Sequence, residues 1–493
     1  MSIMKLKSGT DIRGTAIGEN TDLTDDAVKK ITAGFIHVMK EKTGLPPSDM
    51  TIAVGHDSRL SAERIRNAVV SVLCHYGAKV LDCQLASTPA MFMTTVTADC
   101  TASVQITASH HPFDKNGLKF FTKDGGFENE DIVNILTFAE NADISEVNDA
   151  DNSEKTDFMS EYAAILRKMI CDGIQAENYE KPLEGLHIVT DAGNGAGGFY
   201  ATDVLKKLGA DITGSLYLDP DGRFPNHIPN PENAQAMESI SNAVKSSGAD
   251  FGVIFDTDVD RSACVDSEGK EINRNALIAL AAAIALRDNP GGTIVTDSVT
   301  SDGLKYFIEN VLGGRHHRFK RGYKNVINEA LRLNSMGINA PLAMETSGHA
   351  ALRENYFLDD GAYLITKIII MLVKLRNEGR TIADLIADLP VPLEEKEIRF
   401  RILENDFRSY GQKVIDDFAV YAADREGWTV ADDNHEGVRV SLDKDHGDGW
   451  MLLRLSVHDP ILPFNAESNS EGGVQQIING FNTFISAYDK IEC

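Results

Sequence analysis

Positive charge is scarce in this chain. Of its 493 residues, 48 are lysine or arginine and 74 are aspartate or glutamate, which gives a formal net charge of −26 at pH 7. A surface this acidic repels the phosphates of nucleic acids and the headgroups of anionic membranes, so the composition argues against both as partners. An anionic small molecule needs a locally positive site, and we therefore expect lysine and arginine to gather around any such site.

Paired cysteines and long apolar runs are also lacking. The six cysteines are scattered without a Cys-x-x-Cys pair, which is typical of reduced thiols in a cytosolic protein. The most apolar run, residues 362–375, is interrupted by Lys367 and Lys374. It is shorter than the roughly 20 residues that a bilayer requires, so it predicts a buried helix.

The first seven residues are too few and too polar for a signal peptide, and we expect a cytoplasmic protein. The sequence leaves its oligomeric state open.

The length predicts three or four domains at roughly 150 residues each. Strand-like runs that begin at Thr51, His187 and Thr293 each lead into a polar loop and then a helical stretch. Such a repeat indicates three related α/β units. The expected limits are an acidic segment near residue 150, the region of Asn273, and a proline pair before residue 393. The predicted domains are α/β domains of residues 1–150, 151–273 and 274–392 and a smaller α+β domain of residues 393–493.

Local signals predict individual helices. Thr24 can cap a helix that has acidic residues in its first turn, and Gly44 ends that helix. A second helix is expected from Arg59 to Tyr76, ending at Gly77. These signals define elements but indicate no function.

Residues 103–121 contain two strand-like runs around a short polar turn centred on Ser109. A serine on a turn between strands is expected to be exposed, with its hydroxyl held in a defined direction, which suits a nucleophile or a phosphate carrier. Lys119 lies in the second run. A Ser-His pair in a loop is usually only a turn, and a strand lysine usually faces solvent, so neither residue is decisive alone.

Three aspartates, Asp256, Asp258 and Asp260, alternate directly after the apolar run 251–255. Carboxylates at this spacing can converge on a divalent cation. A calcium loop of the EF-hand type would need glycine and glutamate where Arg261 and Ser267 stand, so that alternative is excluded. Strand ends are where α/β proteins bind ligands. A hydroxyl, a lysine and a hard metal site are the parts of phosphoryl-transfer chemistry.

At this point the chain resembles the α-D-phosphohexomutase family, the phosphomannomutases and phosphoglucomutases, over nearly its full length. The family carries a Thr-Ala-Ser-His-Asn-Pro loop, an Asp-x-Asp-x-Asp-Arg loop, a Gly-Glu-x-Ser-Gly-His loop and an N-terminal Gly-Thr-x-x-Ile-Arg-Gly segment. The similar segments here are Thr107 to Pro112, Asp256 to Arg261, Met344 to His349, Gly9 to Gly14 and, for a further signature, Val54 to Arg59. The resemblance implies three α/β domains and a smaller C-terminal domain around a central cleft.

The resemblance also implies a role for each residue of the site. Ser109 would be the phosphoserine, with Lys119, Arg13 and His349 as the other catalytic residues. Mg²⁺ would be held by Asp256, Asp258 and Asp260 and by a phosphate oxygen on Ser109. The residues expected to bind the substrate are Arg261, Gly322, Lys324, Glu345, Ser347, Arg454, Ser456 and His458.

The C-terminal loop departs from the family pattern. The usual sequence is Arg-x-Ser-Gly-Thr-x-Pro followed by a basic residue, whereas Arg454 to Pro460 lacks that Gly and Thr, and no Lys or Arg occurs before Lys490. A phosphate clamp would therefore depend on Arg454, Ser456, backbone amides and His458.

The leading hypothesis is a Mg²⁺-dependent phosphohexomutase that acts on a small sugar phosphate. It would interconvert hexose 1-phosphate and hexose 6-phosphate, of mannose, glucose or both, through a phosphoserine and a hexose 1,6-bisphosphate, which would also be its activator. The alternatives are a metal-dependent sugar phosphatase and a non-catalytic sugar-phosphate-binding homologue. The sequence does not choose between the hexoses.

Overall fold

The computed structural model describes residues 2–433, 435–456 and 459–492. The chain divides into two compact units, of which unit 1 comprises Met1–Leu277 and Ser347–Ala383 and unit 2 comprises Ile278–Thr346 and Asp384–Cys493. None of the helices in the described ranges is long and apolar enough to cross a membrane. The five described cysteines are free thiols.

The first sheet of unit 1 has the strand order β1-β2-β6-β5-β3-β4-β8, with β7 paired to β6. Strands β3, β4 and β5 are parallel, and β6 runs antiparallel to both of its neighbours, β5 and β2. The strands are β1 (Lys7–Ser8), β2 (Asp11–Thr15), β3 (Thr51–His56), β4 (Lys79–Leu85), β5 (Ala102–Ile106), β6 (Lys115–Thr122), β7 (Gly125–Gly126) and β8 (Glu154–Lys155).

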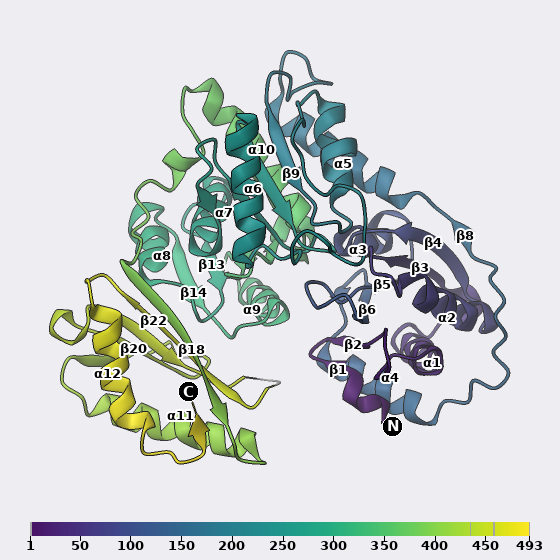
Figure 1. The fold of residues 1–493 in the computed structure, drawn as a ribbon. Coiled ribbons are helices and arrows are strands. Elements are labelled where there is room, and N and C mark those ends of the chain that lie inside the picture. Colours follow the sequence, from purple (N-terminus) through teal and green to yellow (C-terminus); the bar gives the residue numbers. More distant parts are fainter. Residues whose placement is uncertain (1, 434, 457–458, 493) are drawn as a thin grey trace. The chain divides into compact units, whose positions relative to one another are not determined.

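Helices cover both faces of this sheet (Figure 1). Helices α1 (Asp25–Thr43), α2 (Ala62–His75) and α4 (Asn129–Asn141) share one core with Phe120 of β6. Helix α3 (Thr88–Thr97) packs Phe92 against Phe121. Because side chains alternate along a strand, Lys119 lies on the same face as Phe121, away from the α1 core. Short 3-10 turns at Ile3–Leu6 and Pro47–Asp49 complete this part.

The limits of α1 confirm the helix signals in the sequence. The Thr24 side chain accepts the Ala27 N–H, and Gly44 ends the helix in the left-handed region with a φ of 69°. Helix α2 begins at Ala62 rather than at the expected Arg59, because Arg59 lies in the loop before it and its side chain bonds to another loop.

The second sheet of unit 1 has the order β12-β11-β10-β9, in which β9 and β10 are parallel. The antiparallel hairpin of β16 and β17 also belongs to this unit. The apolar run predicted as a buried helix is α10, which packs against α5 and β11. The elements are α5 (Phe158–Ile174), β9 (Ile188–Asp191), a π-helix (Tyr200–Leu205), a 3-10 turn (Lys206–Leu208), α6 (Ala234–Ser247), β10 (Phe251–Phe255), β11 (Ser262–Val265), β12 (Glu271–Ile272), β16 (Ala350–Leu352), a 3-10 turn (Arg353–Asn355), β17 (Leu358–Asp359) and α10 (Gly361–Asn377).

Unit 2 begins within helix α7 (Arg274–Asp288) and contains parallel strands in the order β14-β13-β15. Helix α9 packs against β13 and β15. The elements are β13 (Thr293–Thr296), α8 (Asp302–Tyr306), a π-helix (Phe307–Val311), β14 (Arg315–Arg318), α9 (Tyr323–Ser335) and β15 (Leu342–Met344), with a 3-10 turn shared with unit 1 at Ala383–Leu385.

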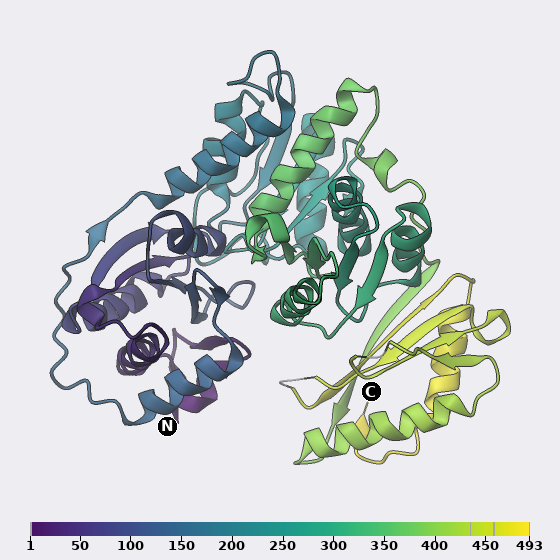
Figure 2. The ribbon, with the colours of Figure 1, turned by 180° about the vertical axis from the view of Figure 1, so that it is seen from behind.

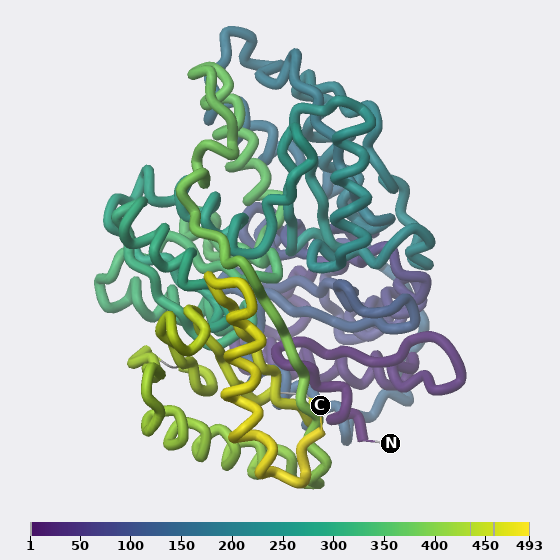
Figure 3. Tube along the Cα trace, turned by 60° about the vertical axis from the view of Figure 1, so that its left-hand side comes forward, coloured from purple at the N-terminus to yellow at the C-terminus, as the bar shows by residue number. Residues whose placement is uncertain are grey.

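The C-terminal part of unit 2 is an antiparallel sheet in the order β19-β20-β21-β22-β18-β23, packed against two helices. Figure 2 shows α11 running along this sheet, and Figure 3 shows α12 beside the long strand β18. Phe418, Phe464 and Phe481 form the centre of its core. The elements are β18 (Glu394–Ile402), α11 (Phe407–Ala423), β19 (Trp428–Val430), β20 (Val438–Leu442), a 3-10 turn (Lys444–His446), β21 (Gly449–Leu453), β22 (Ile461–Ser468), α12 (Gly473–Ile485) and β23 (Ile491–Glu492).

Candidate active site

Ser109 lies in the loop between β5 and β6, with its backbone in the left-handed region at a φ of 50°. The expectation of an exposed serine is wrong, because only 2% of the residue is exposed. The reason is a loop from the second sheet. Ser109 Oγ donates to Asp256 Oδ2 at 3.0 Å and accepts from Arg261 Nη2 at 2.8 Å. The hydroxyl is therefore held between a carboxylate and a guanidinium.

The three alternating aspartates follow strand β10 and converge, as their spacing predicts. One carboxylate oxygen from each of Asp256, Asp258 and Asp260 lies within 4.8 Å of the others, and all three residues are buried. Burial and the charges of Asp260 and Asp258 raise the pKa of Asp256 well above its usual range. Packing three carboxylates so closely is unfavourable unless a cation neutralises them.

Two carboxylate oxygens of this triad are suited to be direct ligands of a metal ion. Asp258 Oδ1 and Asp260 Oδ1 are buried and have no hydrogen-bond partner among the described residues. An unpaired buried carboxylate oxygen is costly, whereas hard divalent cations bind such oxygens. The triad can therefore hold a metal ion.

Lys119 extends from β6 to the same aspartates. Its Nζ lies 2.5 Å from Asp260 Oδ2 and 3.4 Å from Asp258 Oδ2, and only 4% of the residue is exposed. This excludes the alternative of a solvent-facing strand lysine. Lys119 therefore places a positive charge next to Asp258 and Asp260, whose neighbour Asp256 contacts Ser109.

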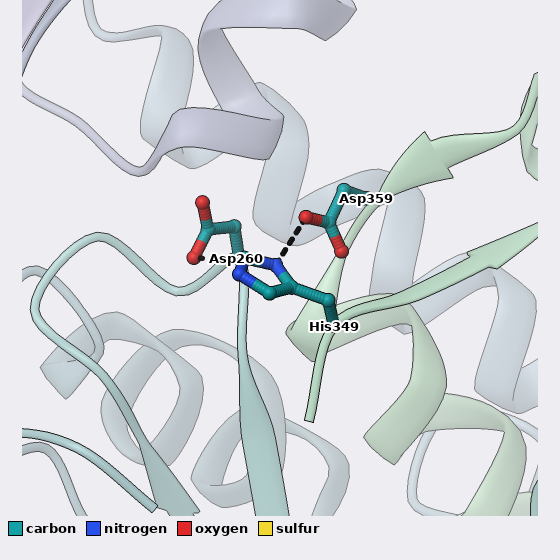
Figure 4. Close-up of side chains that lie close together, drawn as sticks. All are labelled: Asp260, His349 and Asp359. Atoms are coloured by element: carbon teal, nitrogen blue, oxygen red, sulfur yellow. Dashed lines mark ion pairs between the residues drawn. The ribbon is translucent and has the colours of Figure 1, made fainter. Parts of the chain in front are cut away.

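His349 lies between two carboxylates in Figure 4. Its Nδ1 is 4.0 Å from Asp260 Oδ1 and forms a close ion pair with Asp359 Oδ2. A backbone bridge between Arg261 and His349 ties this segment to the aspartate loop. Burial by itself lowers the pKa of His349, but the charges of Asp359 and Asp260 outweigh burial and raise that pKa to about 9. The imidazole is therefore protonated at neutral pH.

Two arginines of the site have different surroundings. Arg261 is fully buried, and besides Ser109 it contacts Asp256 Oδ2 at 3.1 Å and the ring of His110. Arg13 lies on β2 opposite Gly117 of β6 and donates to Asp11 Oδ2 at 2.7 Å.

Unit 1 thus brings together seven of the expected site residues. They are Ser109, Lys119, Asp256, Asp258, Asp260, Arg261 and His349. Ser347 belongs to the same unit, and its buried Oγ has no partner within the described ranges.

The other expected binding residues belong to unit 2. The Gly322 N–H donates to Glu345 Oε1 at 2.6 Å, and Lys324 lies in the first turn of α9. Arg454 Nη1 is 4.0 Å from Glu436 Oε1. Ser456 Oγ accepts the Asp459 N–H at 3.2 Å. His458 lies outside the described residues.

Sequence reasoning missed Asp359 and Glu436. Asp359 is the first of two acidic residues directly before the apolar run of α10, a position that could have suggested it. Glu436 accepts from Ser298 Oγ at 2.5 Å and from the Arg321 N–H at 3.1 Å, besides its contact with Arg454. Nothing in its local sequence indicates this role.

Comparisons with known proteins show to which family the chain belongs. Three domain families match, described as phosphoglucomutase/phosphomannomutase α/β/α domain I over residues 4–143, domain II over residues 162–269 and domain III over residues 273–392. A phosphoglucomutase/phosphomannomutase of Thermococcus kodakarensis is 30% identical over 470 residues, which cover 95% of each chain. A phosphomannomutase/phosphoglucomutase of Pseudomonas putida is 30% identical over 441 residues, or 89% of this chain and 88% of that one.

A solved structure agrees with the fold. The crystal structure of a phosphoglucomutase/phosphomannomutase family protein from Burkholderia thailandensis matches with a TM-score of 0.79 and 25% identity, covering 99% of this chain and 98% of that one. The predicted fold class, three α/β domains and a further C-terminal domain, is confirmed. The exact domain limits stay a prediction. The resemblance seen in the motifs is confirmed as well, and the chain belongs to the phosphoglucomutase/phosphomannomutase family, whose members are mutases that depend on a metal ion.

Proposed function

We propose that this protein interconverts the 1-phosphate and 6-phosphate of a hexose, mannose, glucose or both, with Ser109 as the phosphate carrier. The supporting observation is the position of Ser109 Oγ, which bonds to Asp256 and Arg261 within the cluster that also contains Lys119. A nucleophilic oxygen, anionic metal ligands and two cations are the requirements of phosphoryl transfer. A related protein from Thermococcus kodakarensis is named for both sugars.

The metal ion proposed for the aspartate triad is Mg²⁺. Asp256, Asp258 and Asp260 would hold it, because the site offers only oxygen ligands, which Mg²⁺ prefers. When bound, it supplies positive charge that neutralises the phosphoryl oxygens. Arg261 would add a second positive charge at the phosphoryl group, since its Nη2 contacts Ser109 Oγ.

The transfer conserves atoms and charge in each half of the cycle. A sugar hydroxyl oxygen forms a bond to the phosphorus atom as the bond from that phosphorus to Ser109 Oγ breaks. The hydroxyl proton moves, in net terms, to Ser109 Oγ. We assign its relay to Lys119 and His349, whose polar hydrogens lie beside Asp258 and Asp260. The second half reverses these steps at the other phosphate of the hexose 1,6-bisphosphate, which would also activate unphosphorylated enzyme.

The comparisons favour transfer to a sugar over hydrolysis, because the relatives that match over most of the chain are named phosphoglucomutases and phosphomannomutases. A mere binding protein would have no use for the serine, the lysine and three carboxylates in one cluster. Both alternatives are therefore weaker than the mutase.

Substrate binding is assigned to residues of matching chemistry. Arg13, Arg261, Lys324, Arg454 and Ser456 can bind phosphate oxygens, with arginine as the stronger donor. Gly322, Glu345 and Ser347 can bind sugar hydroxyls. In its protonated form, His458 would be a further phosphate-binding residue.

The experiment is incubation with glucose 1,6-bisphosphate, followed by intact-mass analysis and peptide mapping. One phosphate should appear on Ser109, and Ser109→Ala should lower mutase activity by several orders of magnitude, as expected for losing a covalent carrier. Ser103→Ala is the matched control, because Ser103 is a buried serine of strand β5 and should leave activity near the wild-type value. Phosphate only on another residue would overturn the assignment.

A further inference from the structure

Arg59 is a buried arginine whose guanidinium bonds to the loop between β5 and β6 that carries Ser109, here called the Ser109 loop. It lies between β3 and α2, and none of its side chain is exposed. Its Nη2 donates to the carbonyl oxygens of Ser109 at 2.5 Å and His111 at 2.6 Å. Its Nη1 donates to those of Pro112 at 2.7 Å and Lys115 at 2.8 Å. One guanidinium thus joins carbonyls from both ends of the loop between β5 and β6.

Asp57 completes this arrangement from the other side. Its Oδ2 lies 3.2 Å from Arg59 Nε and accepts the Thr107 hydroxyl at 2.7 Å. Thr107 Oγ1 in turn accepts the Ser109 N–H at 2.9 Å. Both backbone polar groups of Ser109 are therefore held by one buried cluster, the carbonyl by Arg59 and the N–H through Thr107. We call Asp57, Arg59 and Thr107 the loop clamp.

The loop clamp accounts for the unusual backbone of Ser109. A φ of 50° is unfavourable for a residue other than glycine and persists only when its surroundings fix it. Burying a guanidinium is also unfavourable, and burial lowers the pKa of Arg59 although Asp57 opposes that shift. The planar guanidinium has several N–H donors in a fixed geometry, so it can bond to four carbonyl oxygens at once. The ammonium group of lysine cannot make the same set of bonds.

We propose that Arg59 is a positioning residue that holds the Ser109 loop in the conformation from which phosphoryl transfer occurs. The inference rests on the proposed role of Ser109 and deepens it. Arg59 acts through backbone carbonyls, so it need not touch the sugar or the transferred phosphate. A displacement of the reacting atom by about 1 Å can cost about 100-fold in rate. Loss of the fork is therefore expected to reduce the rate rather than the binding of substrate.

The first test is Arg59→Lys, which keeps the positive charge but loses the fork. We expect phosphorylation of Ser109 by glucose 1,6-bisphosphate to slow by about 100-fold, with KM changed much less. Hydrogen exchange, followed by mass spectrometry, should become faster in the peptide containing residues 103–121. The matched control is Arg66→Lys on α2, because Arg66 is a buried arginine paired with Asp82 at 2.8 Å. Its other described hydrogen-bond partners are Asn67, Asp151 and Ser153, which lie outside the Ser109 loop.

The second test addresses Thr107, in case Arg59→Lys fails to fold. Thr107→Val removes the hydroxyl at nearly constant volume and should slow phosphorylation of Ser109, whereas Thr107→Ser should restore most of the rate. Unchanged exchange and phosphorylation in Arg59→Lys, or equal losses in Arg66→Lys, would overturn the loop clamp. Hydrogen exchange reports on the loop whether or not the protein is a mutase. Phosphate missing from Ser109 in the wild-type protein would instead overturn the proposed function.

Discussion

His349 and Asp359 form a buried ion pair that is built into a β-hairpin. Asp359 Oδ1 accepts the Ala350 N–H at 3.0 Å while Oδ2 contacts His349 Nδ1. Strands β16 and β17 pair Ala351 with Asp359, so the hairpin backbone holds Asp359 next to His349. The pair thus gives His349 a fixed orientation and a stabilised positive charge beside Asp260.

Asp359→Asn tests this pair. The variant keeps an acceptor for the Ala350 N–H but loses the negative charge that holds the His349 proton. We expect kcat to fall by about 10- to 100-fold with a small change in KM, the scale for a partner that orients a catalytic group. A coupled assay with glucose 1-phosphate measures both constants. Asp443→Asn is the control, because it alters an exposed His-Asp pair with His446. An unchanged kcat would remove Asp359 from the mechanism.

Asp258→Asn tests the metal site. The loss of one negative ligand should weaken Mg²⁺ binding by roughly 100-fold, since ligand charge sets affinity in such sites. It should also reduce the rise in Tm that Mg²⁺ produces by binding the folded protein. Titration calorimetry and thermal unfolding at several Mg²⁺ concentrations measure these effects. Glu268→Gln, an exposed residue in the turn before β12, removes the same charge and should behave like the wild type. Equal Mg²⁺ affinity in both variants would contradict the role of the triad.

Glu345→Gln tests sugar recognition. Glutamine keeps an acceptor for the Gly322 N–H but removes the charge. We expect kcat/KM for glucose and mannose 1-phosphates to fall by an amount equivalent to about 1.5–3 kcal/mol, the scale of a hydrogen bond to a charged group. Comparing the two sugars shows whether the loss is selective. If neither value of kcat/KM changes, Glu345 does not bind the sugar.

Glu467 gives a pH-dependent stability to the C-terminal part of unit 2. Burial raises the pKa of Glu467 to about 7, although the Trp450 indole N–H and Arg439 favour its charged form. The folded protein therefore holds this proton more tightly than the unfolded chain. Its contribution to the free energy of unfolding is fully present below about pH 4.5 and is lost as the pH rises to about 7.

Glu467→Gln should remove this dependence while keeping an acceptor for Trp450. Relative to the wild type, the variant should gain about 2–3 kcal/mol of unfolding free energy between about pH 4.5 and about pH 8. Urea denaturation at the two pH values measures the difference. Glu471→Gln, at an exposed position after β22, is the control. The prediction fails if the difference between Glu467→Gln and wild type is the same at both pH values.

The amino-acid sequence determined the local elements and the chemical kind of the site. Thr24 and Gly44 set the ends of α1 because capping depends on neighbouring backbone groups. The apolar run 251–255 is strand β10, and the run 362–375 lies within the buried helix α10. Motifs with several fixed positions also indicated the family, because their chemistry is carried by residues close together in the chain.

The tertiary structure decided burial and long-range pairing. Ser109 was expected to be exposed, but the aspartate loop covers it, and no pattern around Ser109 describes a loop from another sheet. Lys119 could have faced solvent until the fold placed its Nζ against Asp260, 141 residues further along the chain. Arg59 looked like the start of a helix, yet its guanidinium bonds to four carbonyls of the Ser109 loop. Local sequence governs backbone propensity, whereas the partner of a buried charge depends on which distant segments pack around it.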